Sequence, residues 1–164
     1  MALENMGYLT LEELKAQTVY PTEERFRKGP VAVIECTHEI PCNPCEGSCK
    51  FGAIKIGDPI TNLPGLVEAN CIGCGICVAQ CPGLAIFIVD KTYSDTQGTV
   101  SFPYEYNPVP EAGQEVDAVD RSGKVVCRGT VVKVQNPKSY DRTPVVTVAV
   151  DLDQVETVRS IKRL

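Results

Sequence analysis

Four closely spaced cysteines near the middle of the chain constrain its fold more than any other feature. Two residues separate the first pair, two the next pair and three the last pair, in the order Cys71, Cys74, Cys77 and Cys81. A loop with this spacing gathers its first three thiols on one side, whereas the fourth lies in a turn that directs its sulfur elsewhere. The pattern is typical of iron–sulfur ligand loops, in which the fourth cysteine binds a different cluster from the first three.

A second run of cysteines lies upstream and departs from this spacing at one position. It consists of Cys36, Cys42, Cys45 and Cys49. A regular run would begin at position 39, which is Glu39, so five residues separate the first two cysteines instead of two. A loop of that length spans a few ångströms easily at about 3.3 Å per residue, and we expect Cys36 to be a ligand. If it is not, the first cluster is a three-iron [3Fe-4S] species or takes another ligand, for which His38 is nearest.

Two such runs predict two [4Fe-4S] clusters that exchange their fourth ligands. Each cubane has four irons and each iron needs one thiolate, so the three leading cysteines of a run leave one iron without a ligand. The first cluster is therefore assigned the thiols of Cys36, Cys42, Cys45 and Cys81. The second cluster is assigned Cys71, Cys74, Cys77 and Cys49.

Disulfide bonds and zinc are the other interpretations of these cysteines. The chain has nine of them, but we expect no signal peptide, because the first residues lack a basic stretch followed by an apolar core. Zinc binds pairs of cysteines at this spacing, but an unbroken run of three cysteines two residues apart, followed by a fourth, is the iron–sulfur spacing rather than two separated zinc-binding pairs. Both interpretations are disfavoured. Cys127 stands alone in an alternating apolar stretch and is expected to be a buried structural residue.

The residues around the two cysteine runs form an internal repeat. Apolar segments at 31–34 and 66–69 precede the runs, and further apolar segments at 51–56 and 82–88 follow them. Each half is therefore predicted to contain a short strand, a cysteine loop, a turn of helix and a second strand, with a repeat of about 35 to 40 residues. Two copies form one unit because neither copy encloses a cluster alone.

On these residues, positions 31–90 resemble the bacterial-type ferredoxins with two [4Fe-4S] clusters. The likeness covers little more than a third of the chain and is most specific at residues 71–82. It implies a βαββαβ-like fold with pseudo-twofold symmetry and one-electron transfer through both clusters. It does not indicate which partners donate and accept the electrons.

The segment before this region is expected to form an N-terminal arm, residues 1–30, with a short helix. Thr10 and Glu13 have the spacing of a capping box, and Leu14 follows on the apolar side of the predicted helix. The arm packs either on its own domain or along a partner subunit, and the sequence leaves both arrangements open.

The segment after the cysteine region changes in composition. Alternating β-branched residues in 93–164 predict a small all-β barrel or roll, with a hairpin turn at Ser122-Gly123. Asp151 to Asp153 have the form of a helix cap, which predicts a C-terminal helix with one apolar side made of Val155, Val158 and Ile161. The expected fold class is α+β, with a ferredoxin-like dicluster domain over 31–92.

The net charge also differs between the N-terminal and C-terminal parts of the chain, and this difference indicates what kind of partner surface to expect. Residues 1–100 contain seven basic and twelve acidic residues, 7 − 12 = −5, whereas residues 101–164 contain nine of each. An acidic cluster domain favours an electropositive face on a redox partner. Because the C-terminal half is neutral, nucleic-acid binding through Lys124, Arg128, Lys133, Lys138 and Arg142 is not expected. No apolar run reaches the length of about 18 residues that a membrane span needs.

The chain lacks the motifs of an independent enzyme. It has no dinucleotide-binding glycine motif, no phosphate-binding loop and a single histidine, so no catalytic site of its own is predicted. We expect a cytoplasmic electron-transfer subunit of a flavin-dependent oxidoreductase, bound to flavoprotein or other oxidoreductase subunits in a hetero-oligomer. A stand-alone soluble ferredoxin and an iron–sulfur regulatory or nucleic-acid-binding protein are the alternatives.

Overall fold

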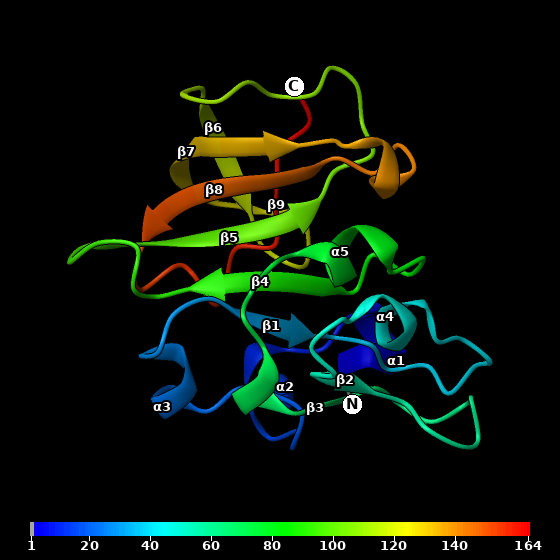
Figure 1. The fold of residues 1–164 in the computed structure, drawn as a ribbon. Coiled ribbons are helices and arrows are strands. Elements are labelled where there is room, and N and C mark those ends of the chain that lie inside the picture. The colour runs from blue at the N-terminus through cyan, green and yellow to red at the C-terminus, as the bar shows by residue number, and fades with distance from the viewer. Residues whose placement is uncertain (1) are drawn as a thin grey trace.

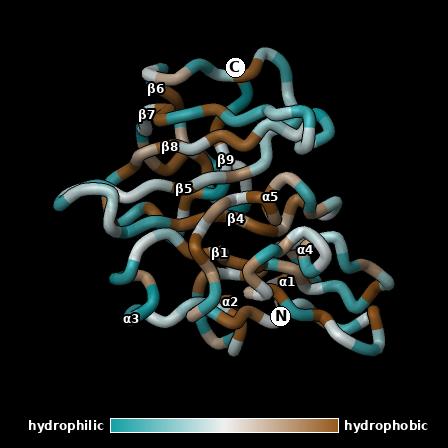
Figure 2. Tube along the Cα trace, viewed as in Figure 1, coloured by the Kyte–Doolittle hydropathy of each residue, from teal (hydrophilic) through white to brown (hydrophobic). Residues whose placement is uncertain are grey.

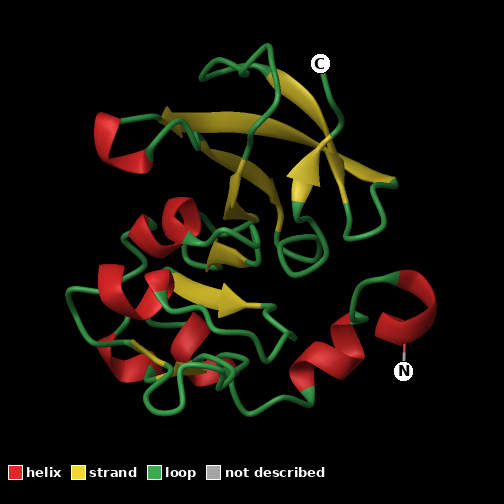
Figure 3. Ribbon diagram, turned by 90° about the vertical axis from the view of Figure 1, so that its right-hand side faces the viewer, coloured by secondary structure: helices red, strands yellow, loops and turns green. Residues whose placement is uncertain are grey.

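The computed structural model describes residues 2–164 and shows one large antiparallel sheet (Figure 1), with most of the short helices gathered at one end (Figure 3). The helices are α1 (Ala2–Met6), α2 (Leu11–Lys15), α3 (Glu23–Phe26), α4 (Pro44–Ser48) and α5 (Ile76–Gln80), with 3₁₀ turns η1 (Glu68–Asn70) and η2 (Lys138–Tyr140). The strands are β1 (Val31–Ile34), β2 (Ile54–Lys55), β3 (Gly65–Leu66), β4 (Ile86–Asp90), β5 (Gln97–Pro103), β6 (Glu115–Val119), β7 (Val125–Gln135), β8 (Val145–Asp151) and β9 (Ser160–Ile161).

Seven strands form the main sheet in the order β1-β4-β5-β8-β7-β6-β9, and β2 pairs with β3 in a separate ribbon. Within residues 2–164, β1 and β9 are the edges, so the sheet is open rather than closed into a barrel. Ile88 of β4 lies opposite Ala32 of β1 on one side and Ser101 of β5 on the other. The cysteine-bearing half and the C-terminal half therefore share one continuous sheet.

The two cysteine-bearing halves are related by a constant offset. Helix α4 begins at residue 44 and α5 at residue 76, so the offset is 76 − 44 = 32 residues. The Glu35 amide donates to the carbonyl of Ala85 at 2.8 Å, and 32 positions later the Val67 amide donates to Ala53 at 2.7 Å. The repeat is thus somewhat shorter than the predicted length of about 35 to 40 residues.

The strand predicted at 66–69 is mostly absent. Strand β3 ends at Leu66, and residues 68–70 form the 3₁₀ turn η1. Its partner β2 has only two residues, so the ladder ends after the pairs Ile54–Leu66 and Lys55–Gly65. The chain turns through η1 directly before Cys71, so the apolar pattern at 66–69 does not continue as a strand.

The predicted hairpin in the C-terminal half is confirmed. Strands β6 and β7 pair antiparallel around the turn that contains Ser122 and Gly123. One Asp120 carboxylate oxygen accepts hydrogen bonds from the amides of Ser122 at 2.8 Å and Lys124 at 3.0 Å. Gly123 has a φ of 81°, a backbone conformation that favours glycine.

The predicted C-terminal helix is wrong. After β8 the chain makes consecutive turns over residues 152–157 and then forms β9. The amides of Arg159 and Lys162 donate to the carbonyls of Val119 and Asp117, at 2.9 and 2.8 Å, which adds this segment to the edge of β6. The apolar spacing that predicted a helix instead buries three side chains in the core, those of Val155, Val158 and Ile161.

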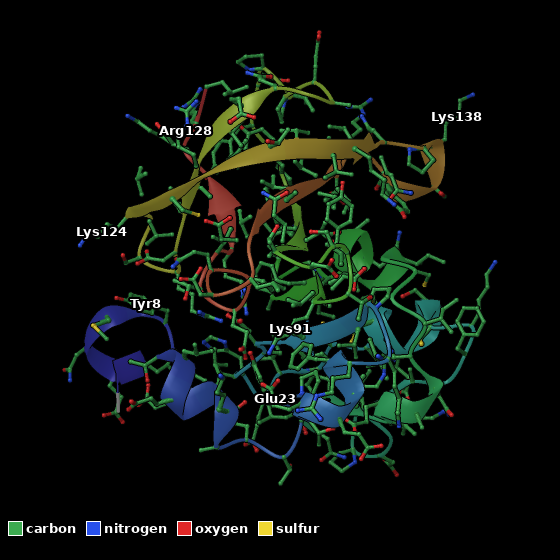
Figure 4. All side chains as sticks on the ribbon, turned by 90° about the vertical axis from the view of Figure 1, so that its left-hand side faces the viewer. Tyr8, Glu23, Lys91, Lys124, Arg128 and Lys138 are labelled. Carbon is green, nitrogen blue, oxygen red and sulfur yellow. The ribbon has the colours of Figure 1, made fainter. Side chains whose placement is uncertain are left out.

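The N-terminal arm packs on its own chain. The predicted capping box is present at the start of α2. The Thr10 amide donates to the Glu13 carboxylate, and the Glu13 amide donates to the Thr10 hydroxyl. The side chain of Leu14 is fully buried, and it belongs with Phe26 to the same core cluster as strands β1, β4, β5 and β8. Figure 2 shows the apolar segments of β1 and β4 between the arm and the rest of the sheet, and Figure 4 shows Glu23 and Lys91 pointing toward one another at this contact.

Candidate metal centres

The first group of thiols lies around the N-terminal half of the cysteine region. Cys36 follows β1, Cys42 and Cys45 flank the start of α4, and Cys81 ends α5. All four line one pocket of about 740 Å³. The upstream run thus contributes three of these thiols and the downstream run contributes the fourth.

The second group lies in a separate, smaller pocket. Cys71, Cys74 and Cys77 line it from the loop before α5, and Cys49 lines it from the end of α4. Its other walls are mainly apolar side chains, among them Phe51, Ile72, Ile76 and Ile88. Here the downstream run contributes three thiols and the upstream run one, which mirrors the first group.

The thiols of each group are close enough to perturb each other. Burial raises the pKa of Cys45 to about 11, with further contributions from Cys81 and Cys42. Burial likewise raises the pKa of Cys77 to about 12, and its other thiol neighbours raise it further; these are Cys71, Cys74 and Cys49. Grouped thiols that resist ionisation lose their protons when a positively charged metal core offsets their mutual repulsion.

The donor set of each pocket fits an iron–sulfur cluster chemically. Soft thiolate ligands suit iron–sulfur clusters, as they also suit zinc and copper(I). Among residues 2–164, no three His, Cys, Asp or Glu side chains converge on a single-ion site.

Backbone amides donate hydrogen bonds to three of the sulfurs. The Ala53 amide lies 3.2 Å from Cys49 Sγ, and the Ala85 amide, 32 residues later, lies 3.5 Å from Cys81 Sγ. The Ala32 amide of β1 lies 3.3 Å from the sulfur of Cys71. Hydrogen bonds of this kind orient metal ligands and withdraw electron density from sulfur.

Two glycines shape the loop that carries the second group. Gly75 has a φ of 81° and stands immediately before α5, which allows the chain to turn sharply into the helix. Gly73 has a φ of 66°, and a Cβ atom there would lie 2.5 Å from Cβ of Pro30. The loop therefore approaches the end of the arm so closely that a side chain at position 73 does not fit.

The other candidate residues lie in different surroundings. His38 is exposed and lines the first pocket, with Nδ1 3.4 Å from the hydroxyl of Thr37. Glu39, at the position where the repeat would place a cysteine, is exposed. Cys127 lies on β7 outside both pockets and is half-buried rather than fully buried; burial raises the pKa of its thiol.

Arg25 of α3 is a buried site residue that sequence reasoning missed. Its Nη2 donates to the carbonyls of Cys71 at 2.6 Å and Pro30 at 2.8 Å. Its Nε donates to Glu68 O at 2.8 Å and its Nη1 to Gly29 O at 3.0 Å. One guanidinium from the arm thus fixes the start of the second cysteine loop.

A buried charged cluster at the first pocket was also missed. Glu35, the residue before Cys36, accepts hydrogen bonds from Arg121 at 2.7 and 2.9 Å and from Arg159 Nε at 2.7 Å. Burial alone would raise the pKa of Glu35, but the two guanidiniums together hold it below its ordinary value. The only sequence signal was a glutamate directly after an apolar strand, because its partners lie 86 and 124 residues away.

A family model described as the 4Fe-4S binding domain matches residues 65–87. The chain therefore contains an iron–sulfur ferredoxin segment. This ferredoxin segment spans three of the four thiols of the second group, together with Cys81 of the first. No helix among residues 2–164 has the length and apolarity needed to span a bilayer.

Several proteins are similar in sequence to part of this chain. Protein Pixie of Drosophila melanogaster is 29% identical over 68% of this chain and 20% of its own length. Translation initiation factor rli1 of Schizosaccharomyces pombe is 30% identical over 61% of this chain and 19% of its own length. An uncharacterized ferredoxin of Methanocaldococcus jannaschii is 34% identical over 43% of this chain and 45% of its own length. The match thus spans about a fifth of the first two relatives, and no solved structure matches.

Proposed function

We propose that this chain binds two [4Fe-4S] clusters and transfers electrons as the iron–sulfur subunit of a larger oxidoreductase. The first cluster is held by Cys36, Cys42, Cys45 and Cys81, and the second by Cys71, Cys74, Cys77 and Cys49. One observation carries the proposal: eight thiols divide into two pockets of four, each with three thiols from one run and one from the other. When bound, such clusters supply one-electron transfer chemistry.

The residues of the chain hold and shield this chemistry. Thiolates bind iron, and the amides of Ala32, Ala53 and Ala85 donate to the sulfurs. Apolar side chains such as Ile76 and Ile88 limit the access of water to the second pocket. Solvent access and hydrogen bonds to sulfur are two of the factors that set the potential of such clusters.

A larger complex is supported by the surface near the two pockets. Large apolar side chains lining them are exposed, including Ile40 and Leu84 at the first pocket and Phe51 and Ile72 at the second. Exposed apolar residues grouped at a functional site suit a protein interface. The net charge of −5 favours an electropositive partner surface. We propose a flavoprotein as this partner and a reducing, cytoplasmic location for the complex.

Metal analysis of anaerobically purified protein tests the cofactor part of the proposal. We expect about eight irons and about eight inorganic sulfides per chain, four of each per cluster. Cys77→Ser should reduce the iron content, whereas the matched control Cys127→Ser should leave it unchanged. Stoichiometric zinc in place of iron would overturn the proposal.

Affinity isolation from the native source tests the partner part. The proposal predicts that other subunits co-purify at constant stoichiometry and that the complex contains a flavin. A monomer that purifies alone with its clusters intact would instead identify a stand-alone ferredoxin.

A second candidate function rests on the relatives, two of which are named translation initiation factors. A role beside nucleic acid predicts salt-sensitive binding of RNA by the iron-loaded protein and loss of that binding when the clusters are destroyed. Absence of RNA retention at low salt would exclude this role.

A further inference from the structure

Two buried arginines outside the cysteine repeat lie next to the two thiol groups. Arg25 comes from the N-terminal arm and is 7% exposed, and Arg159 comes from the C-terminal segment before β9 and is 4% exposed. Arginine stays protonated in proteins, so each side chain is a buried positive charge. A buried charge is costly unless something compensates it.

Each arginine contacts the beginning of one cysteine run. Arg25 donates to the carbonyl of Cys71, the first thiol of the downstream run. Arg159 donates to the carboxylate of Glu35, which directly precedes Cys36, the first cysteine of the upstream run, and both residues line the first pocket. The arm and the C-terminal segment thus supply one guanidinium each, to opposite halves of the repeat.

Among residues 2–164, Arg25 forms hydrogen bonds to backbone groups rather than an ion pair with a carboxylate. Its guanidinium donates to four backbone carbonyls, those of Gly29, Pro30, Glu68 and Cys71. The Glu68 carboxylate is engaged elsewhere, because it accepts hydrogen bonds from the amide and hydroxyl of Thr22. The guanidinium of Arg25 therefore contacts the second cysteine run directly, through the carbonyl of Cys71, without a carboxylate bonded to it.

At the first pocket two guanidiniums share one carboxylate. Arg121 and Arg159 both bond Glu35, which leaves a net charge of one positive unit in this buried cluster. Arg159 Nη1 donates to the carbonyls of Val155 and Val158, while its Nη2 is buried and has no hydrogen-bond partner in the described structure. Buried polar groups without a partner are uncommon in folded proteins, and an ordered water or an anionic group in the first pocket would satisfy this donor.

We propose that Arg25 and Arg159 are tuning residues, each of which raises the reduction potential of one cluster: Arg159 that of the first and Arg25 that of the second. This inference rests on the proposed function. Reduction adds one electron, supplied by the redox partner, to a group already made anionic by four thiolates. A nearby buried positive charge stabilises the added negative charge, so removing it disfavours the reduced form.

Redox titration followed by electron paramagnetic resonance tests this assignment in the full-length, iron-loaded protein. Cys45→Ser and Cys77→Ser identify the signals of the first and second cluster. Arg159→Met should lower the ratio of reduced to oxidised first cluster at least tenfold at a fixed potential, equivalent to about 59 mV for a one-electron couple. Arg25→Met should do the same for the second cluster only. Each variant is the control for the other.

Further variants separate charge from packing. Arg159→Lys and Arg25→Lys keep the charge and should restore most of the potential, which a purely structural role would not require. Glu35→Gln removes the carboxylate that both Arg121 and Arg159 bond. It should shift the reduction potential of the first cluster in the opposite direction, toward easier reduction. Arg128→Met removes an exposed arginine on β7 (Figure 4) that lines neither pocket, and it should shift neither cluster.

The outcomes distinguish the two proposals. Protein without iron and sulfide would refute the proposed function itself. Protein with both clusters but with potentials unchanged in the methionine variants, or with both clusters shifted equally by either variant, would refute the tuning role alone. If a methionine variant does not retain its clusters, glutamine replaces methionine at that position, and Glu35→Gln gives a second test of the first cluster. Unchanged potentials in these variants would also refute the tuning role.

Discussion

The Tyr20 hydroxyl donates a hydrogen bond of 2.7 Å to Oε1 of Glu156, a residue 136 positions away. The same carboxylate forms ion pairs with Lys15 at 3.0 Å and Lys91 at 2.9 Å. Glu156 therefore joins the N-terminal arm, the end of β4 and the C-terminal segment at one point. Because Lys91 also pairs with Glu23 of α3, the contact extends along the arm.

Glu156→Gln should weaken this junction. Charged hydrogen bonds that are partly buried contribute more than exposed ones, so we expect the free energy of unfolding at neutral pH to fall by about 1–2 kcal/mol. Urea unfolding followed by circular dichroism under anaerobic conditions measures the change. An exposed-pair control, Glu24→Gln, should change the stability much less, because the Glu24–Lys28 pair lies in solvent. Equal effects of the two substitutions would show that Glu156 is not a junction.

The contribution of Glu156 should depend on pH in one direction. Burial raises the pKa of Glu156, but hydrogen bonds from Lys91, Tyr20 and Lys15 outweigh it and hold the pKa below the ordinary glutamate value. A depressed pKa means that the stabilisation is complete above the unfolded-state pKa, about 4.3, and is lost as the pH falls through the folded-state value. The stability difference between the wild type and Glu156→Gln should be constant from neutral pH down to about 5.5 and shrink below about 4.3. A difference that grows on acidification would contradict this sign.

Leu14→Ala should loosen the arm. Leu14 is fully buried in the main core, and removal of a buried leucine side chain costs about 2–5 kcal/mol because a cavity remains. Limited proteolysis should then cleave residues 1–30 faster than in the wild type. Leu11→Ala is the matched control, since Leu11 is only partly buried and should give a smaller effect.

Gly129→Ala should strain the sheet where β7 pairs with β8. A Cβ atom at position 129 would lie 2.5 Å from Val148 Cγ1 and 3.0 Å from the Ala149 carbonyl oxygen. Overpacking of this kind costs about 1–3 kcal/mol. Gly65→Ala on β3 meets only an ordinary contact of 3.6 Å and should be nearly neutral when both are compared by thermal unfolding. An unchanged midpoint for Gly129→Ala would show that β7 moves freely away from β8.

Cys36→Ser tests the irregular position of the upstream run. A hydroxyl binds iron more weakly than a thiolate, so the first cluster should lose one iron, and the iron content should fall from about eight to about seven per chain. The oxidised protein should then show the paramagnetic signal of a three-iron cluster. If the variant keeps all its iron, Cys36 is not a ligand, and His38→Ala becomes the next substitution to test.

The sequence alone indicated the elements whose information is local. The capping box of Thr10 and Glu13 and the hairpin at Ser122-Gly123 depend on residues a few positions apart, and both are present. The three leading thiols of each run also lie together, because short loops limit where each sulfur lies, whereas the fourth thiol of each pocket is brought in by the fold from the other run. The C-terminal helix failed for the complementary reason: β9 gains its hydrogen bonds from β6, a strand distant in sequence.

Spacing in the sequence thus determined the three leading thiols of each group, since these lie within short stretches of chain. Only the tertiary structure decided that one sheet runs through the cysteine-bearing and C-terminal halves, and that Arg25 and Arg159 reach the two cysteine runs from outside the repeat. Contacts between residues tens of positions apart depend on how strands pair and which charges become buried together. Residue order does not reveal such contacts, because a charged side chain has the same local pattern whether its partner lies in solvent or in the core.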